Sequence, residues 1–387
     1  MPSPTTLNPF RVVLRHRNFR LFLIGQTLSL IGTWMQTMAQ GWLALELTNS
    51  AFLVGLVATV SAVPILLFTM PAGAIVDRSD KLRIVRIAQV AFLGGVIASI
   101  EIPARQAMMI DLVGREDLPD AIALNSSGFN LARVVGPGLA AAVIARLGIA
   151  WCFFLNAASF LAVLAGLFMM QLPPWVPVRH RTSPWQGVVQ VIRYMRDTPD
   201  IRALMLMVTF YSIFNAPVLA LMPVVAREMF SLGAGGYGLL LSFLGIGGLC
   251  GALGLAAVGD RISRTRLLTV VSMLWPALLM TFSLTRVPWI GYGLLFAIGV
   301  VMILNGAIAN GLLQGLVPDA LRGRIMAAYG LVVVGLAQVV GAFTGGVVAH
   351  AVGVAGAIFT TALLMAAYGV WAFLRRPELR ELRARTV

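Results

Sequence analysis

Long runs of apolar residues alternate along the whole chain with short segments that carry most of the charged side chains. Runs such as 53–76, 204–226 and 294–309 contain no Asp, Glu, Lys or Arg. Because a helix of about 20 apolar residues crosses the hydrocarbon layer of a bilayer, this pattern predicts transmembrane helices. The predicted spans are 19–45, 51–75, 84–102, 121–147, 150–171, 201–226, 235–259, 267–285, 288–312, 321–349 and 354–374.

The segment 84–102 is the weakest candidate for a crossing. Its uncharged part, Ile87 to Ile100, reaches only about 21 Å as a helix, against about 30 Å of hydrocarbon. Arg86 and Arg105 flank it. Its length alone therefore does not support a full crossing.

Composition agrees with a membrane protein. Of 387 residues, 59% are hydrophobic and 11% are charged, and the mean hydropathy is +0.89. A soluble domain is nearer half apolar and about a quarter charged. We therefore expect an all-α, multi-pass protein whose surroundings are the lipid bilayer.

The net charge of +14 is distributed in short basic groups between the apolar runs, such as Arg11 to Arg20, Arg78 to Arg86 and Arg375 to Arg385. This distribution is typical of cytoplasmic loops under the positive-inside rule, and it argues against nucleic acid as a partner. It predicts a multi-pass protein of the bacterial cytoplasmic (inner) membrane with both termini in the cytoplasm.

The chain divides into two halves that resemble each other. The longest polar stretch predicts a cytoplasmic linker at 173–200, between helical halves at 1–172 and 201–387. Asp77-Arg78 recurs as Asp260-Arg261, and Leu112-Val113 recurs as Leu316-Val317. Parallel repeats of this kind are common in transporters. Between these two markers the first half is about 21 residues shorter, close to the length of one transmembrane helix.

The basic loops after the segment 84–102 indicate whether this segment crosses the membrane. If it crossed once, Arg105 and every later loop would change side, including the basic linker. We therefore expect it to begin and end in the cytoplasm, as a re-entrant or distorted element or a non-native fusion, with a single crossing as the alternative. On this interpretation it is the remainder of a third and a fourth helix.

The segment Gly73-Ala-Ile-Val-Asp77-Arg78 follows the second span and ends in a basic loop. It resembles the loop signature of the major facilitator superfamily. Gly73 permits close helix packing, and Asp77 can face the positive N-terminus of a neighbouring helix. The resemblance implies that Gly73, Asp77 and Arg78, with Asp260 and Arg261 in the repeat, act in gating and conformational change.

Further motifs are similar to the drug and siderophore efflux branch of this superfamily, which includes macrolide efflux proteins and enterobactin exporters. They are 18–22, Gly32 to Gln36, Glu46 to Ser50, Pro103 to Gln106 and Asn125 to Pro137. The resemblance covers most of residues 10–375 and implies twelve helices in two halves that export a substrate. About eleven spans fit here, with the third and fourth merged or truncated.

Polar residues within the spans are candidates for a substrate cavity. Gln26, Thr33, Gln36 and Gln40 fall, with Ser29 and Thr37, within an arc of about 100° on the first span. Such a stripe faces either a cavity or another helix. Trp34 lies off the stripe, which is compatible with a lipid-facing position.

The span from 121 carries a second polar stripe. Asn130, Arg133 and Pro137 share, with Ser126, an arc of about 60°. An arginine within a membrane indicates function and an expected partner, unless it reaches the cytoplasmic end. Gly136 and Pro137 resemble a motif of drug antiporters and permit close packing with a kink.

The second half offers Asn215 and Asn305 as further cavity candidates, although they form no single stripe, which favours a structural role over ligand binding for each. Asn310, Gln314 and Tyr329 are similar cases. Glu46 and Glu101 are the acids that we would test first for proton coupling. Neither the histidines nor Cys152 and Cys250 have metal-ligand spacing, and no nucleotide-binding loop occurs, so we expect no metal and no cofactor.

These observations favour a monomeric secondary transporter that exports small amphipathic molecules, such as a drug or a siderophore, by alternating access with protons as the coupling ion of an antiporter. The alternative is a shortened relative that does not transport or that has a regulatory role. A membrane-embedded enzyme needs paired acids, histidines or a nucleophile at membrane depth, and the spans contain no such set.

Overall fold

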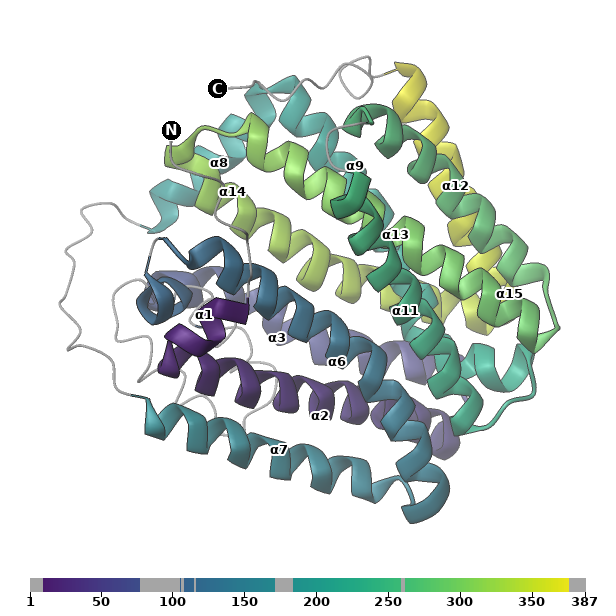
Figure 1. The fold of residues 1–387 in the computed structure, drawn as a ribbon. Coiled ribbons are helices and arrows are strands. Elements are labelled where there is room, and N and C mark those ends of the chain that lie inside the picture. The colour runs from purple at the N-terminus through teal and green to yellow at the C-terminus, as the bar shows by residue number, and fades with distance from the viewer. Residues whose placement is uncertain are drawn as a thin grey trace.

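The computed structural model describes residues 10–76, 105, 108–114, 116–170, 184–258 and 262–375, and these parts are almost entirely helical (Figure 1). The helices of the first part are α1 (Phe10–Arg15), α2 (Arg17–Thr48), α3 (Ala51–Val76), α6 (Leu118–Leu147) and α7 (Ala150–Met169). A short helical run at 108–113 precedes α6.

The later part of the chain continues as a series of helices up to residue 375. They are α8 (Pro184–Asp197), α9 (Pro199–Ala220), α10 (Met222–Val224), α11 (Ala234–Val258), α12 (Arg264–Leu284), α13 (Pro288–Leu316), α14 (Asp319–Gly330) and α15 (Ala337–Arg375). Two π-helical turns, Val225–Met229 and Leu331–Leu336, continue α10 and connect α14 to α15. Gly353, with a φ of 76°, breaks α15 into two helices, so this region passes through the bundle twice.

Ten of the eleven predicted spans coincide with helices in the described residues. Eight helices there are long and apolar enough to cross a membrane, the last of them containing both passes of 321–375. At 32 residues α2 is long enough, but its polar stripe makes it less apolar than these eight. The segment 84–102 lies outside the described residues, as do Asp77, Arg78, Glu101, Asp260 and Arg261.

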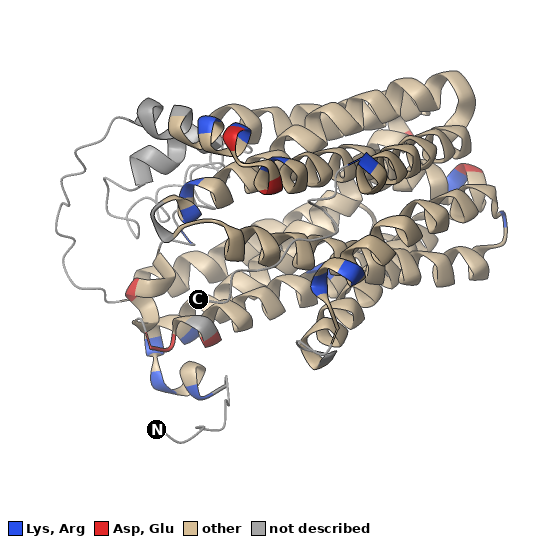
Figure 2. Cartoon of the chain, turned by 90° about the horizontal axis from the view of Figure 1, so that it is seen from above, with Lys and Arg blue, Asp and Glu red and all other residues tan. Residues whose placement is uncertain are grey.

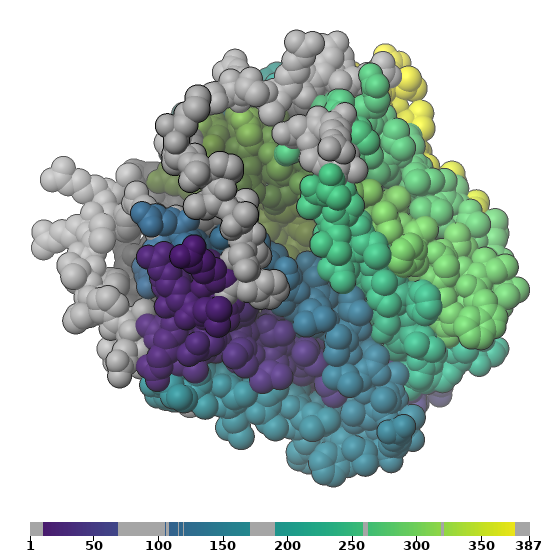
Figure 3. All heavy atoms as spheres, in the orientation of Figure 1, coloured from purple at the N-terminus to yellow at the C-terminus, as the bar shows by residue number. Residues whose placement is uncertain are grey.

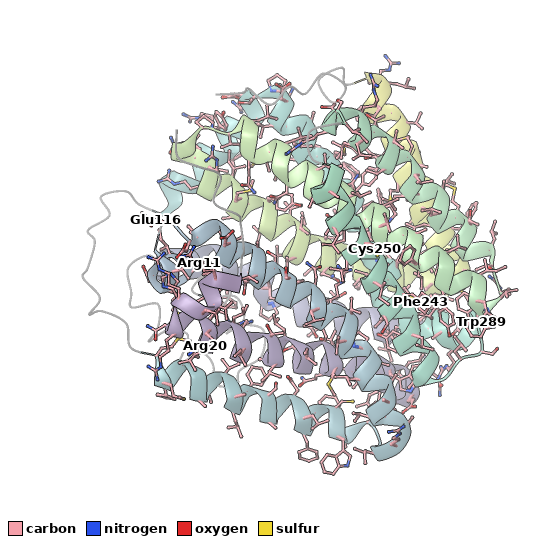
Figure 4. The ribbon with its side chains drawn as sticks, in the orientation of Figure 1. Arg11, Arg20, Glu116, Phe243, Cys250 and Trp289 are labelled. Atoms are coloured by element: carbon pink, nitrogen blue, oxygen red, sulfur yellow. The ribbon has the colours of Figure 1, made fainter. Side chains whose placement is uncertain are left out.

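The two ends of the bundle differ in charge. We call the end at which α2 and α6 begin the His16 end, and the opposite end the Trp42 end. Figure 2 shows that most of the charged residues lie toward the side of the N-terminus. Arg11, Arg20 and Glu116 lie together at the His16 end in Figure 4, far from Trp289. The described charges therefore concentrate at one face, as the positive-inside pattern predicts for the cytoplasmic side.

The helices before and after the linker pack into two groups, which Figure 3 shows as a purple-blue region and a green-yellow region. In the first group α2 packs on α6 and α7, and in the second α11 packs on α13 while α9 packs on α15. The groups meet along two pairs of helices, α3 with α15 and α6 with α11. Any site between these four helices thus receives side chains from both groups.

The predicted linker 173–200 contains a helix, because α8 occupies Pro184–Asp197. It packs against α9 and α14, and Arg324 Nη1 donates a hydrogen bond to Gln190 Oε1 at 2.8 Å. The boundaries 1–172 and 201–387 stay predictions, since residues 171–183 lie outside the described part.

Candidate functional site

Side chains from three helices converge in the middle of the bundle. Arg133 of α6 and Asn215 of α9 approach the same atom, Met302 Sδ of α13: the distances are 4.0 Å from Arg133 Nη2 and 3.7 Å from Asn215 Nδ2. Arg133 lies near the midpoint of α6, and Met302 near that of α13. The structure therefore places two of the predicted cavity residues opposite each other, across the junction of the two groups.

The guanidinium of Arg133 has apolar surroundings. Its Cζ lies 5.9 Å from the centre of the Trp34 ring, and Trp34 packs edge-on against Phe129 at 6.0 Å. No carboxylate among the described residues lies within ion-pair distance of it. The acids on the surrounding helices are Glu46, Asp120 and Asp200, about 18 to 22 Å along the helix axes from this level.

These contacts do not offset the cost of the charge. An arginine at the centre of a bilayer costs about 2.5–3.5 kcal/mol on insertion scales, whereas a cation–π contact stabilises by about 0.5–2 kcal/mol. Arg133 is half-buried as a residue. Its position is thus that of a charge without a counter-charge among the described residues, at the junction of the two groups.

A buried polar network lies beside this centre. Asn305 Nδ2 donates to Ser272 Oγ at 2.7 Å, and Tyr211 OH donates to the backbone oxygen of Ser272 at the same distance. Asn305 is 3% exposed and Ser272 is fully buried. The network joins α9, α12 and α13 within the second group, so Asn305 has a structural partner while Asn215 faces the centre.

Some residues of the polar stripe of α2 are buried or bonded to α7, and others are exposed. Gln36 Oε1 accepts a hydrogen bond of 2.6 Å from Asn156 Nδ2 of α7, which is an interhelical contact within the first group. Thr33 and Gln40 are exposed, whereas Gln26 is 5% exposed and its Oε1 is buried without a hydrogen-bond partner. Asn130 donates to Ser126 of its own helix.

Trp34 packs against α6, which is the neighbour that its position off the polar stripe left open. A Cβ at Gly136 would lie 2.5 Å from Trp34 Cβ and 3.0 Å from Ile31 O, so the glycine permits the close approach of α2 and α6. Pro137 lies in the next position, inside α6. The position of Trp34 on its helix excludes it from the polar stripe but does not reveal which neighbour it faces.

Aromatic residues close the junction at the Trp42 end. Trp42 of α2 stacks on Tyr237 of α11 with ring centres 6.0 Å apart, and both are buried. Trp42 Nε1 donates to Glu46 Oε1 at 2.5 Å. A Cβ at Gly41 would lie 3.6 Å from Pro223 Cγ. The two groups are therefore in direct contact at this end.

Contact between α6 and α11 continues as far as the level of Arg133. Ser242 Oγ donates to Val134 O at 3.2 Å, and a Cβ at Gly245 would lie 3.3 Å from Arg133 O. Toward the His16 end Ala256, which lies on the same face of α11 as Gly245, is exposed. The inner part of α11 is thus free of α6, while its outer part is held against it.

Sequence reasoning missed several residues at this junction. Met302 is apolar and gave no signal, and Asn156 and Ser272 are single polar residues within apolar runs, a signal that was available. Trp42 and Tyr237 are far apart in sequence, so their stacking had no local signature. Among the described residues no group of His, Cys, Asp and Glu could hold a metal ion.

Two helical groups that meet along α3–α15 and α6–α11 around a central polar site define a transporter of the major facilitator class. Solved structures agree in fold. A bacterial homologue of the human lysosomal transporter Spinster, in an inward-facing and unoccupied conformation, has a TM-score of 0.72 at 12% identity over 96% of this chain and 99% of that chain. A D-xylose–proton symporter has a TM-score of 0.68 at 14% identity over 94% and 99%.

The chain belongs to the transmembrane secretion effector family, whose model matches residues 5–93 and 84–386. It is 28% identical over 390 residues to the multidrug efflux pump Tap of Mycolicibacterium fortuitum, covering 91% of this chain and 93% of the relative. It is 26% identical over 338 residues to an enterobactin exporter of Citrobacter koseri, covering 80% of each. The chain is thus a multi-pass membrane protein and a secondary transporter of small molecules, not an enzyme.

The matches also bear on the shortened region. The two matched segments of the family overlap at 84–93, within the doubtful span. The alignment with Tap extends over 390 residues, more than this chain contains, while it covers 91% of the chain. The relative therefore carries residues that this chain lacks.

Proposed function

We propose that this protein exports small amphipathic organic molecules across the bacterial cytoplasmic membrane by alternating access. The observation that carries the proposal is the convergence of Arg133, Asn215 and Met302 from both groups at mid-membrane depth. Relatives that are a multidrug efflux pump and an enterobactin exporter support export as the direction.

In this proposal the groups rock about the central site. The Trp42 end is the outer side, closed by the Trp42–Tyr237 stack, and the His16 end is the cytoplasmic side, where substrate enters. The cavity is lined by polar residues of both groups. The lining residues that we propose are Thr33, Gln40, Asn130, Arg133 and Asn215. The other candidates from the sequence are buried or hydrogen-bonded to a helix of their own group, and they are Gln26, Gln36 and Asn305.

Glu46 is our candidate for proton coupling, because its carboxylate holds the indole of Trp42 at the outer contact. Protonation would weaken that hydrogen bond, so the outer contact would open more easily when Glu46 is neutral. Glu101 is the second candidate from the sequence. We propose a monomer, since each chain supplies both groups of a complete site.

A second candidate function is a relative that no longer transports. The observation that favours it is the shortened region, where the two matched segments of the family overlap. Loss of about one helix from the first half would leave part of the cavity wall incomplete. Both candidates share the fold and differ in whether any substrate crosses.

An efflux assay in a drug-sensitive bacterial host separates the two. The full chain, expressed and inserted in the inner membrane, should lower the intracellular level of a fluorescent drug in an energy-dependent manner. The control is the Trp42→Ala, Tyr237→Ala double variant at the same membrane level, which removes the outer contact. Correct insertion without any substrate-dependent effect, over a panel of cationic, neutral and anionic compounds, would favour the inactive relative.

A further inference from the structure

The positive charge at the centre of the site has no counter-charge among the described residues, so a ligand that binds there would be favoured if it were negatively charged. Arg133 contributes a permanent cation, since guanidinium does not lose its proton in proteins. Its recorded contacts are a thioether sulfur at 4.0 Å and an indole face at 5.9 Å. Neither neutralises the charge, and none of the three acids on the surrounding helices lies near this level.

The side chain is also directed toward the junction of the two groups. Arg133 is only partly buried, and it points from α6 toward Met302 of the other group rather than toward lipid. The amide of Asn215 approaches Met302 Sδ from α9, at 3.7 Å. A ligand that displaces the weak sulfur contact would thus meet a guanidinium and an amide N–H, both of which donate hydrogen bonds.

An aromatic surface borders the same position. Trp34 and Phe129 form an edge-on pair beside the guanidinium, and Phe129 is 44% exposed. A planar ring can stack there while an anionic group of the same molecule reaches Arg133. The arrangement of one cation, one amide and two aromatic rings fits an organic anion with an aromatic part.

We propose that the substrate of this transporter is an aromatic organic anion, such as a carboxylate, a phenolate or a sulfonate, and that Arg133 binds its negative charge. This inference rests on the proposed export function and adds the sign of the charge that the substrate carries. The anion completes an ion pair within the membrane, and its release on the outer side leaves Arg133 uncompensated again. Binding is thus specific for charge as well as for shape.

The test compares two probes that share a xanthene skeleton, the anion fluorescein and the cation rhodamine 123. Binding is measured by fluorescence anisotropy with the purified full chain in detergent, and transport by uptake into everted membrane vesicles. The variants are Arg133→Gln, Arg133→Lys and, as a matched control, Arg146→Gln, an exposed arginine on the same helix.

We expect the wild-type protein to bind fluorescein in preference to rhodamine 123. Arg133→Gln should raise the Kd for fluorescein by about 30-fold or more, since it removes one partner of a desolvated ion pair. Arg133→Lys should keep part of the affinity, and Arg146→Gln should keep all of it. Rhodamine 123 binding should not weaken in Arg133→Gln.

Any of three binding results would overturn the assignment. The first is wild-type protein that does not bind fluorescein, and the second is equal affinity for fluorescein in wild type and Arg133→Gln. The third is a folded Arg133→Gln protein whose affinity falls equally for both probes. The two readouts separate this inference from the proposed function. Binding that depends on Arg133 without vesicle uptake of either probe would refute export alone, whereas uptake that is independent of Arg133 would refute the anion site alone.

Discussion

Single side chains join the helices of the first group, and the hydrogen bond between Asn156 and Gln36 is the clearest case. Asn156 is 4% exposed and links α7 to α2 at the level of Gly32. Interhelical hydrogen bonds in membrane proteins contribute about 0.6 kcal/mol on average and at most about 1.7. This one also satisfies an amide that would otherwise be buried without a partner.

We therefore expect Asn156→Ala to lower the free energy of unfolding by about 0.6–1.7 kcal/mol. The measurement is the thermal unfolding midpoint of the purified protein in detergent. Asn130→Ala is the matched control, because Asn130 bonds only within its own helix. Equal midpoints for the two variants would contradict the contact.

At the His16 end, Asp117 is a residue whose stability contribution depends on pH. His16 Nε2 lies 2.7 Å from Asp117 Oδ2, and this hydrogen bond, assisted by Arg15, holds the pKa of Asp117 below its usual value. A pKa that is lower in the folded than in the unfolded state stabilises the fold above the unfolded pKa of about 3.9. The contribution is lost as the pH falls through the folded pKa.

Asp117→Asn should accordingly make the local stability of this end of the protein depend less on pH in the acid range. The measurement is hydrogen exchange of residues 10–20 between neutral pH and about pH 3, below the unfolded pKa. Wild type should lose protection over the acid part of this range, whereas the variant should be less protected at neutral pH and change less. Parallel profiles would show that the pair does not hold α1 and the start of α2.

At the scale of residues, sequence reasoning located the charge but not its contacts. Arg133 and Asn215 were candidates because polar groups are costly within a membrane. Met302 could not be found in this way, because a methionine among leucines and isoleucines is normal membrane composition. The environment of Trp34 could not be found either, since its helical position is known from sequence while the packing of α6 against α2 is not.

Glycines determine how closely the helices of the two groups approach. In α3, a Cβ at Gly55 would lie 2.7 Å from Ala342 O and 3.0 Å from Gly346 Cα, both on α15. These atoms belong to the backbone, so they cannot rotate away. Gly254 of α11 provides the opposite case, with nothing within 4 Å of an added Cβ.

Gly55→Ala should therefore destabilise the protein by about 1–3 kcal/mol through overpacking between α3 and α15. Gly254→Ala should be neutral or stabilise by up to about 1 kcal/mol, because alanine favours the helix. Thermal unfolding in detergent measures both. A Gly55→Ala protein as stable as Gly254→Ala would show that α3 and α15 are not in close contact.

At the scale of elements, the apolar runs predicted the helices well, because about 20 apolar residues have one stable solution in a bilayer. Ten predicted spans coincide with helices, and even the break at Gly353 lies between the last two predicted spans. The helix α8 was missed within the linker, since its apolar residues are too few for a span. The π-helical turn at Leu331–Leu336 has no composition that distinguishes it from an α-helix.

For the whole molecule, alternating access requires the Trp42 end to open. A Cβ at Gly41 of α2 would lie 3.6 Å from Pro223 Cγ, so these two positions face each other across the closed junction and suit a test with a pair of cysteines. The protein Gly41→Cys, Pro223→Cys, with Cys152→Ser and Cys250→Ser, should lose transport on oxidation and regain it on reduction. Each single-cysteine protein is the control. Full transport by the oxidised pair would show that the Trp42 end does not need to open.

The path of residues 84–102 is a second question for the whole molecule. The positive-inside distribution of the basic loops places Arg83 and Arg105 on the same, cytoplasmic side. It predicts that cysteines placed beside them are both labelled from that side by a membrane-impermeant maleimide. Cysteines at the Trp42 end serve as the control for the other side. Labelling of the two positions from opposite sides would establish a single crossing.

The contact between α6 and α11 has a mechanical consequence. Because α11 touches α6 at Gly245 and is free beyond it, the helix pair acts as a lever whose fulcrum lies at the level of Arg133. The free arm from Gly245 to Val258 is about 20 Å long, so a tilt of about 10° displaces its tip by about 3–4 Å. The guanidinium, beside the fulcrum, hardly moves. A bound molecule would thus remain in place while the passage to either side of the membrane changes width.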